Sequence, residues 1–218
     1  MTLIQAFILD LDGVLTDTAQ YHFQAWKRLA DDEQIPFTRA ANEHLRGVSR
    51  RESLMLLLGA HRHDYTEAQI QEMMGRKNSY YQELLSELTT DNFLPGAAEL
   101  LQALKQRGLK IAIGSASKNT HTVLRRLHIR ELFDAIGDGY SVERAKPAPD
   151  LFLHVAAELG VTPEACAVVE DARSGVEAAL ASNMLAIGIG PEERVGAAHY
   201  RYASTAAIDL DEILGATE

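Results

Sequence analysis

Short apolar runs that alternate with helical patterns constrain the fold of this chain more than any other feature of its sequence. Four runs are candidates for buried parallel strands, and a fifth, at 133–138, is weaker. The four are AFIL at 6–9, KIAIG at 110–114, ACAVV at 165–169 and MLAIGIG at 184–190. Amphipathic helical patterns between the later runs lie at 97–108, 119–129 and 149–160. Such alternation predicts an α/β fold with a doubly wound, Rossmann-like parallel sheet.

One connection breaks this alternation. About a hundred residues separate the first apolar run from the second, whereas a strand–helix–strand unit takes roughly 30. The intervening segment has helical patterns throughout. Two capping boxes mark helix starts in it, Ser49 with Glu52 and Thr66 with Gln69. We therefore expect an α-helical cap domain at 17–91, inserted into a discontinuous core of 1–16 and 92–218. Both crossings lie beside the end of the first strand, so the cap should cover it.

Composition excludes several classes of protein. The chain has 218 residues, of which 46% are hydrophobic, and this is enough to bury a sizeable core. Its formal net charge is −10 and no basic stripe is visible, which argues against nucleic-acid binding. No run approaches the ~20 apolar residues of a membrane span, and the start does not resemble a secretion signal. We expect a cytoplasmic monomer that does not bind membranes and acts on a small molecule. The single cysteine, Cys166, should be a buried and inert thiol.

Polar side chains follow the predicted strands at the points where these strands end. In open parallel sheets, ligands bind outside the carboxyl ends of the strands. Asp10 and Asp12 follow the first strand, 115–119 follows the second, and Glu170 and Asp171 follow ACAVV. A further segment, AKPAPD at 145–150, places Lys146 before two prolines. These residues should therefore gather at one edge of the sheet.

Four carboxylates in one cleft need compensation. Each like-charged pair at ~4 Å costs roughly 4 kcal/mol at an effective dielectric near 20. Mg²⁺ relieves this repulsion and takes phosphate oxygens as further ligands. Ser115 and Ser117, with backbone N–H groups at a helix start, would form an anion seat. Lys118 and Lys146 supply local positive charge. The combination predicts phosphoryl transfer, in which a protein mostly positions groups and stabilises charge.

Each signal has a structural alternative when taken alone. Asp-x-Asp-Gly after a strand can be a turn, GSASKN can be a helix cap, and Lys146 can be a surface lysine. Their order and shared placement at strand ends favour a site. By contrast, His61 and His63 lack two further ligands nearby, so we expect a solvated loop there and no zinc site.

These motifs, in this order, resemble those of the haloacid dehalogenase superfamily of aspartate-nucleophile phosphotransferases. Three longer stretches, DLDGVLTDTAQYHFQAW, LRGVSRRES and GSASKN, are similar to the sugar-phosphate mutases of that superfamily. The chain departs from the pattern at three positions. Leu9 stands where Phe is frequent, Ala172 where Ser is common, and Arg46 where these mutases usually carry Lys. Arginine keeps the charge but changes the hydrogen-bond geometry.

The resemblance implies a role for each site residue. Asp10 would be the nucleophile that forms an aspartyl phosphate, and Asp12 the general acid/base. Asp10, the Asp12 carbonyl, Glu170 and Asp171 would hold Mg²⁺. Ser115 and Lys146 would hold the transferring phosphoryl group. The remaining candidates for phosphate, sugar or hinge contacts are Thr18, His22, Trp26, Arg46, Gly47, Val48, Arg50, Lys77, Ala116, Ser117, Lys118 and Asn119. Of these, Trp26 has the alternative of helix core and Lys77 that of a solvated lysine.

The resemblance also implies a reaction. The expected activity is the Mg²⁺-dependent interconversion of β-D-glucose 1-phosphate and glucose 6-phosphate, with β-glucose 1,6-bisphosphate as primer and intermediate. Such an enzyme must exclude water, and the helical cap would do so. One competing hypothesis is a sugar-phosphate phosphatase that uses the same carboxylates. The other is a non-catalytic sugar-phosphate sensor, which the intact acidic set makes hard to explain.

Overall fold

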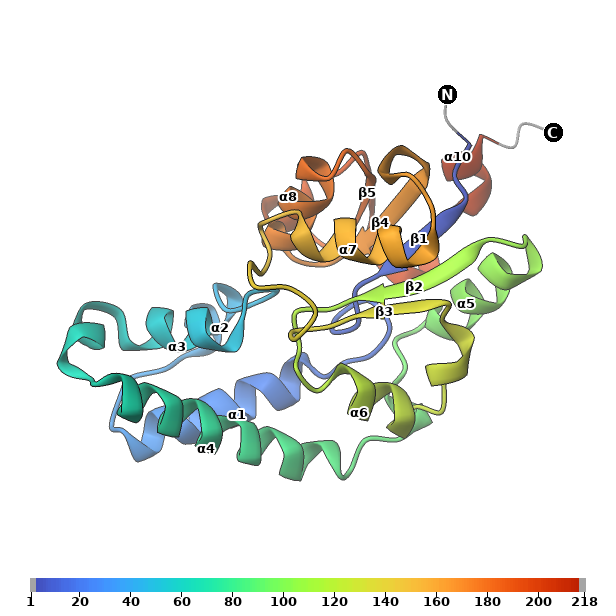
Figure 1. Ribbon diagram of the computed structural model, residues 1–218. Coiled ribbons are helices and arrows are strands. Elements are labelled where there is room, and N and C mark those ends of the chain that lie inside the picture. Colours follow the sequence, from blue (N-terminus) through green and yellow to red (C-terminus); the bar gives the residue numbers. More distant parts are fainter. Residues whose placement is uncertain (1–2, 216–218) are drawn as a thin grey trace.

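The computed structural model describes residues 3–215, which contain one parallel sheet with helices on both faces (Figure 1). Its strands are β1 (Ala6–Leu9), β2 (Lys110–Gly114), β3 (Ala135–Gly137), β4 (Cys166–Glu170), β5 (Leu185–Ile189) and β6 (Tyr200–Tyr202). Their order is β3-β2-β1-β4-β5-β6, and every neighbouring pair is parallel. The predicted doubly wound α/β fold is confirmed. The strand order reverses between β1 and β4, which is where such sheets bind ligands.

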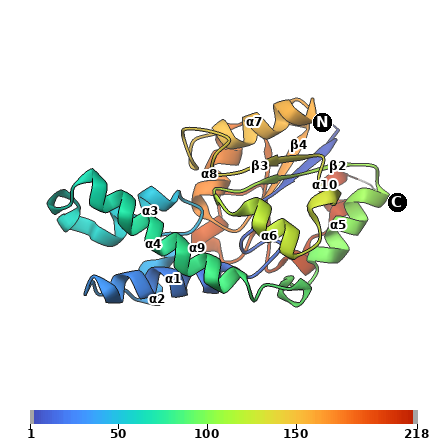
Figure 2. The same cartoon turned by 60° about the horizontal axis from the view of Figure 1, so that its bottom comes forward.

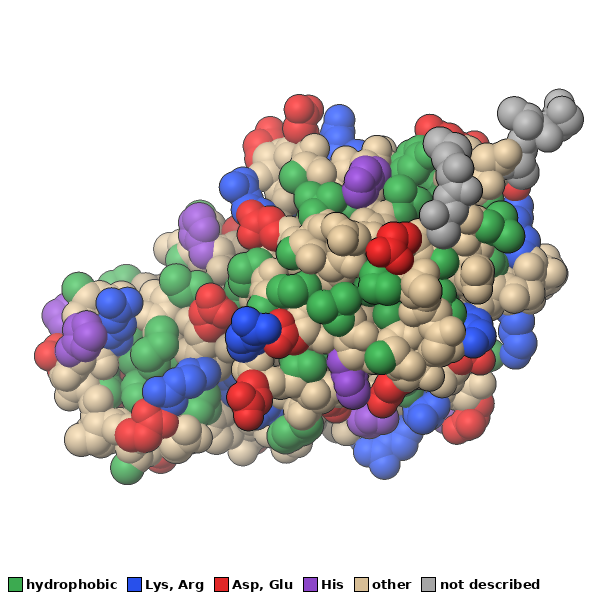
Figure 3. Space-filling model, turned by 45° about the horizontal axis from the view of Figure 1, so that its top comes forward, with side chains coloured by type: hydrophobic (Ala, Val, Ile, Leu, Met, Phe, Trp, Pro, Cys, Tyr) green, Lys and Arg blue, Asp and Glu red, His purple; other side chains and the backbone are tan. Residues whose placement is uncertain are grey.

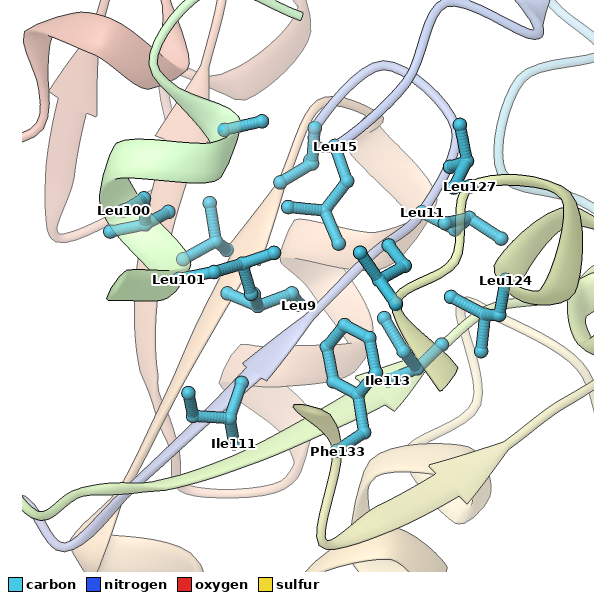
Figure 4. Packing of buried hydrophobic residues seen from close by; sticks show 14 of the residues in the cluster. Leu9, Leu11, Leu15, Leu100, Leu101, Ile111, Ile113, Leu124, Leu127 and Phe133 are labelled. Atoms are coloured by element: carbon cyan, nitrogen blue, oxygen red, sulfur yellow. The ribbon is translucent and has the colours of Figure 1, made fainter. Parts of the chain in front are cut away.

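Side chains alternate between the two faces of the sheet, because successive residues of a strand point to opposite sides. Phe7 and Leu9 of β1 lie in the core under α5 (Ala97–Gln106) and α6 (Thr120–Arg126). Figure 4 shows this packing around Leu9, Leu101 and Ile113. Ala6 and Ile8 lie in the opposite core, under α7 (Asp150–Leu159) and α8 (Arg173–Ala181). Both faces are thus covered, as the continuous apolar strands require.

Six further helices are present among the described residues, and three of them are only four or five residues long. They are α1 (Ala19–Asp32), α2 (Arg39–Glu43), α3 (Arg50–Leu58), α4 (Glu67–Leu85), α9 (Glu192–Val195) and α10 (Leu210–Leu214). Short segments of 3₁₀ helix lie at Gly59–Asp64, Thr90–Asn92, Arg130–Leu132, Pro163–Ala165 and Thr205–Ala207. Strand β6 was not predicted, because its sequence, Tyr-Arg-Tyr, has no apolar run and no fully buried side chain.

The segment between β1 and α5 is helical and has its own core. Helices α1 and α4 run side by side next to the sheet, and α2 and α3 lie over them (Figures 1 and 2). Trp26, Leu29, Leu54 and Met73 are among the buried residues of this separate cluster. The capping box at Thr66 is complete. At the other predicted box, Ser49 accepts a hydrogen bond from the Glu52 N–H.

The two chain crossings that lead into and out of this helical segment lie against each other. The Leu94 N–H donates to the Leu15 carbonyl at 3.0 Å, and Thr16 Oγ1 donates to the Asn92 carbonyl at 2.8 Å. Thr16 also forms an isolated bridge with Asp12. The helical segment is therefore tied to the core within a few residues of the predicted catalytic pair.

Charge on the surface is mixed. On the face in Figure 3, Lys and Arg side chains lie among Asp and Glu and form no continuous basic band. His61 and His63 are exposed on a 3₁₀ turn, with no further metal-ligating cluster among residues 3–215. Cys166 is buried, and burial raises the pKa of its thiol to about 11. Within the described residues no helix combines the length and the apolarity of a membrane span.

Candidate active site

Asp10 and Asp12 stand at the carboxyl end of β1, where the strand order reverses. The Asp10 N–H donates to the Val169 carbonyl at 2.9 Å, which continues the ladder between β1 and β4 by one residue. This bond fixes the backbone position of Asp10 and thereby the direction in which its side chain projects. Asp10 is 6% exposed, and both carboxylates face a common cavity. The local turn thus presents two acids to one space.

Lys146 joins the end of β1 to the end of β4. It comes from the loop after β3 and is fully buried. Its Nζ donates to Asp10 Oδ1 at 2.7 Å, to the Gly114 carbonyl at 2.8 Å, and to Glu170 Oε1. The three ammonium protons thus have three acceptors. Burial acts to lower the pKa of Lys146, but attraction to Asp10 and Glu170 outweighs it and raises the pKa. The surface-lysine alternative is excluded.

The acids at this edge carry more negative charge than Lys146 can balance. Burial raises the pKa of Asp10, and the nearby Asp12 charge adds to this while Lys146 opposes it. Burial likewise raises the pKa of Asp171 to about 6, with Arg46 compensating only in part. In both carboxyl groups the cost of burial thus outweighs the attraction of the neighbouring cation.

The chemistry of these groups fits Mg²⁺. Asp12 Oδ1 is buried and has no hydrogen-bond partner. Gly13, at φ +89°, lets the Asp171 carboxylate approach, because a Cβ there would lie 2.4 Å from Asp171 Oδ2. No ready-made group of three or more metal-ligating side chains exists within residues 3–215. Mg²⁺ commonly uses only one or two carboxylates together with water and phosphate. Asp10, Asp12 and Asp171 are the residues that would hold it.

Glu170, predicted to ligate the metal, uses both of its oxygens within the protein. Oε1 accepts from Lys146, and Oε2 accepts from the Ala172 N–H at 2.9 Å. It is 1% exposed and does not line the cavity. In this arrangement Glu170 positions Lys146, and its role as a metal ligand stays a prediction.

The loop after β2 folds back on its own serine side chains. Ser115 Oγ accepts from the Ser117 N–H at 3.2 Å, and Ser117 Oγ accepts from the Asn119 N–H at 3.1 Å. Two of the backbone N–H groups expected to form the anion seat are therefore occupied. Residues 115–119 nevertheless line the cavity, so the loop offers hydroxyl, amide and ammonium groups to it.

The helical segment contributes a buried relay above Asp12. His22 Nε2 lies 3.7 Å from Asp12 Oδ2, and His22 Nδ1 lies 2.9 Å from Lys77 Nζ. Lys77 is 2% exposed, which excludes the solvated alternative. Burial and, to a lesser extent, the Arg50 charge lower the pKa of Lys77 to about 7. Burial and the Lys77 charge lower the pKa of His22. When Lys77 is charged it can only donate, and His22 then accepts at Nδ1 and carries its proton on Nε2, toward Asp12.

Trp26 and Thr18 differ in their relation to the cavity. Trp26 lines the cavity and also packs in the core of the helical segment, and its role in substrate binding stays a prediction. The Lys77 Nζ lies 4.9 Å from the centre of its ring. Thr18 is fully buried, does not line the cavity, and its Oγ1 lacks a partner.

The loop 46–48 closes the cavity against the end of β4. Arg46 Nη1 donates to Asp171 Oδ2 at 2.7 Å. Gly47, at φ +69°, packs so closely that a Cβ would lie 2.6 Å from Ser174 Oγ. Val48 lines the cavity beside it. Arg46, at the position where related mutases usually carry lysine, thus brings a guanidinium into contact with Asp171, a predicted metal ligand.

The cavity has a volume of about 750 Å³, within the usual range for small-molecule sites. It brings together all predicted site residues except Thr18, Lys146 and Glu170. Sequence reasoning missed Asp138 and Tyr140 of its wall, and also Asn78, which bonds to two wall residues. Asp138 and Tyr140 were missed because the turn at 138–141 follows the weakest of the predicted strands. Asn78 was missed because nothing in the sequence marks it except its position next to Lys77.

A comparison with known proteins identifies the class. The family model of the haloacid dehalogenase-like hydrolases matches residues 4–183. The chain therefore belongs to the haloacid dehalogenase-like hydrolase family. It is 48% identical over 189 residues to the β-phosphoglucomutase of Bacillus subtilis, covering 86% of this chain and 84% of that protein.

Two further relatives cover nearly the whole chain. A crystal structure of β-phosphoglucomutase from Clostridium difficile matches with a TM-score of 0.94 at 40% identity, over 98% of this chain and 96% of that one. A phosphorylated carbohydrates phosphatase of Thermotoga maritima is 32% identical over 97% of each chain. Both mutases and phosphatases are thus among the relatives.

Proposed function

We propose that this protein is a β-phosphoglucomutase, an isomerase that interconverts β-D-glucose 1-phosphate and glucose 6-phosphate through an aspartyl phosphate. The similarity to the Bacillus subtilis enzyme over most of both chains carries the choice of reaction. The geometry supports the chemistry, because one cavity contains the acids Asp10 and Asp12 together with the cations of the helical segment. The proposed substrates are phosphorylated sugars, and β-glucose 1,6-bisphosphate is the proposed primer and intermediate.

Asp10 is the proposed nucleophile. Lys146 holds its Oδ1, which leaves Oδ2 for attack on phosphorus. When the phosphoryl group moves to Asp10, the charge that accumulates on its oxygens meets Lys146 and the hydroxyl of Ser115. Bound Mg²⁺ would neutralise further charge on the phosphoryl oxygens.

Asp12 is the proposed general acid/base. It lies two residues beyond Asp10 and faces the same cavity. As a carboxylate it takes the proton of the attacking sugar hydroxyl, and as an acid it returns a proton to the leaving oxygen. Its Oδ2 lies 3.7 Å from His22 Nε2. Because His22 belongs to the helical segment, Asp12 meets this partner only while the segment is closed over the site.

Water exclusion separates a mutase from a phosphatase, and we propose that residues 17–91 act as a cap domain over a core of 1–16 and 92–218. Arg46 and Gly47 contact the end of β4, and this brings the cap down beside Asp10. A phosphorylated Asp10 under this cap would meet the sugar hydroxyl before it meets solvent.

A coupled assay tests the reaction. With β-glucose 1-phosphate, Mg²⁺ and a trace of β-glucose 1,6-bisphosphate, we expect glucose 6-phosphate without stoichiometric inorganic phosphate. Chelation of Mg²⁺ by EDTA should abolish turnover. Release of inorganic phosphate in place of glucose 6-phosphate would instead identify a phosphatase. Absence of any Mg²⁺-dependent turnover would identify a sensor.

Replacement of Lys77 tests the buried relay through stability. The folded-state pKa of Lys77 is about 7, below the ordinary value of about 10.4, so the unfolded chain binds more protons between these values. The contribution of Lys77 to the free energy of unfolding should therefore become more favourable as the pH rises across this window. Lys77→Met should remove this dependence and stabilise the protein at pH 7 by about 2–4 kcal/mol, at roughly 1.4 kcal/mol per pKa unit. The gain should vanish near pH 10.

Urea unfolding between pH 6.5 and 10 measures this effect. Lys27→Met is the control, because Lys27 lies on α1 and is partly exposed beside Asp31. Its free energy of unfolding should change little, and equally at every pH. A Lys77→Met difference that does not vary with pH would contradict the depressed pKa. We also expect lower turnover, since His22 loses the partner that fixes its tautomer.

A further inference from the structure

Two cations of the cavity are held by neutral groups. Lys118 Nζ lies 4.7 Å from the centre of the Tyr140 ring. Arg50 donates from Nη2 to Asn78 Oδ1 at 2.7 Å. Neither cation has a carboxylate within 4.0 Å among residues 3–215. A neutral partner limits the motion of a long side chain and leaves its charge available to an anion.

The other arginines of the cavity wall are neutralised. Arg46 pairs with Asp171 at 2.7 Å, and Arg51 pairs with Glu67 at 2.6 Å. Arg50 is different, because burial lowers its pKa and no carboxylate opposes this effect. A half-buried guanidinium without an ion pair is costly for the protein alone, and a bound phosphate dianion would remove that cost.

Asn78 also joins the helical segment to the sheet domain. Its Oδ1 accepts a second hydrogen bond from Asn119 Nδ2 at 3.0 Å. Asn119 Oδ1 in turn accepts from Gln82 Nε2 at 3.4 Å, and this contact orients the Asn119 amide. Asn78 and Gln82 lie four residues apart on α4 and therefore share one face of this helix. Asn119 belongs to the loop after β2. One carbonyl oxygen thus receives a donor from each side of the cavity.

We propose that Asn78 is a positioning residue for the phosphate monoester group of the substrate. Its carbonyl oxygen places the donors of Arg50 and Asn119 side by side without cancelling the Arg50 charge. The remaining guanidinium N–H groups and the second amide N–H of Asn119 then bind the phosphate oxygens. This pair of donors assembles only when the helical segment is closed. The inference rests on the function proposed above for the choice of sugar phosphate as ligand.

Two variants of Asn78 separate this role from a purely structural one. Asn78→Ala removes the acceptor, whereas Asn78→Asp keeps an oxygen of the same size and position but pairs with Arg50. We expect KM for β-glucose 1-phosphate to rise about tenfold in the alanine variant and about 100-fold in the aspartate variant. In both, kcat should stay within about threefold. Ser79→Ala, at the next, exposed position of α4, is the control and should match the wild type.

Binding is measured independently of turnover. Trp26 is the single tryptophan of the chain and lines the cavity, so its fluorescence can follow titration with inorganic phosphate. The affinities should fall in the order wild type, Asn78→Ala, Asn78→Asp. Wild-type affinity in both variants would overturn the inference, as would an aspartate variant that binds as well as or better than the alanine variant. If the wild type failed to convert β-glucose 1-phosphate but the phosphate affinities kept this order, the proposed function would fail and the role of Asn78 would stand.

Discussion

Asp10→Asn should reduce the turnover of β-glucose 1-phosphate by at least about 10³-fold while the protein stays folded. An amide nitrogen and a neutral oxygen cannot form the aspartyl phosphate, so no partial reaction remains. The change is isosteric, and it removes one of the charges whose mutual repulsion raises the pKa of Asp171. Lys146 keeps Glu170 and the Gly114 carbonyl as acceptors. The free energy of unfolding should therefore change by less than about 1 kcal/mol.

The coupled assay and circular dichroism together test this expectation. Asp17→Asn is the matched control, because Asp17 lies in the same segment but is exposed. It should retain wild-type turnover. Labelled phosphate from the bisphosphate primer should become attached to the wild type and to the control, and not to the Asp10 variant. Substantial turnover by Asp10→Asn would assign the nucleophile to another residue.

Lys146→Met should destabilise the protein by about 3–5 kcal/mol and eliminate turnover. The side chain is fully buried and forms ion pairs with two buried carboxylates, those of Asp10 and Glu170. Its removal leaves Asp10 and Glu170 uncompensated, and a buried charge without its partner is far more costly than the pair is favourable. For a domain of this size the loss corresponds to a melting temperature about 10 °C lower.

Thermal and urea unfolding in EDTA measure this loss without compensation by a metal. Lys105→Met on α5 is the control, since Lys105 is exposed and should tolerate the change. Because protonation of Asp10 or Glu170 removes the unpaired charge, the deficit of Lys146→Met should shrink as the pH falls. Wild-type stability in the variant would mean that Lys146 does not compensate these acids.

The sequence by itself determined the sheet and the positions of the acids. Short apolar runs bounded by turn residues predict buried strands, and the helical patterns between them predict parallel crossovers. Residues that end such strands must meet at one edge, so Asp10, Asp12 and Asp171 could be gathered before any coordinates were known. Strand β6 was not predicted from the sequence, because its pairing depends on the neighbouring strand β5 and not on its own hydrophobicity.

Only the tertiary structure decided which partner each charged group has. Glu170 and Asp171 are adjacent, yet one bonds to Lys146 and the other to Arg46. Arg50 and Arg51 are also adjacent, yet only Arg51 has a carboxylate partner. Charge interactions depend on distances of a few ångströms and on burial. These are set by the packing of segments that are distant in the sequence: Lys146 and Asp10 lie 136 positions apart, and Arg194 and Glu43 lie 151 apart.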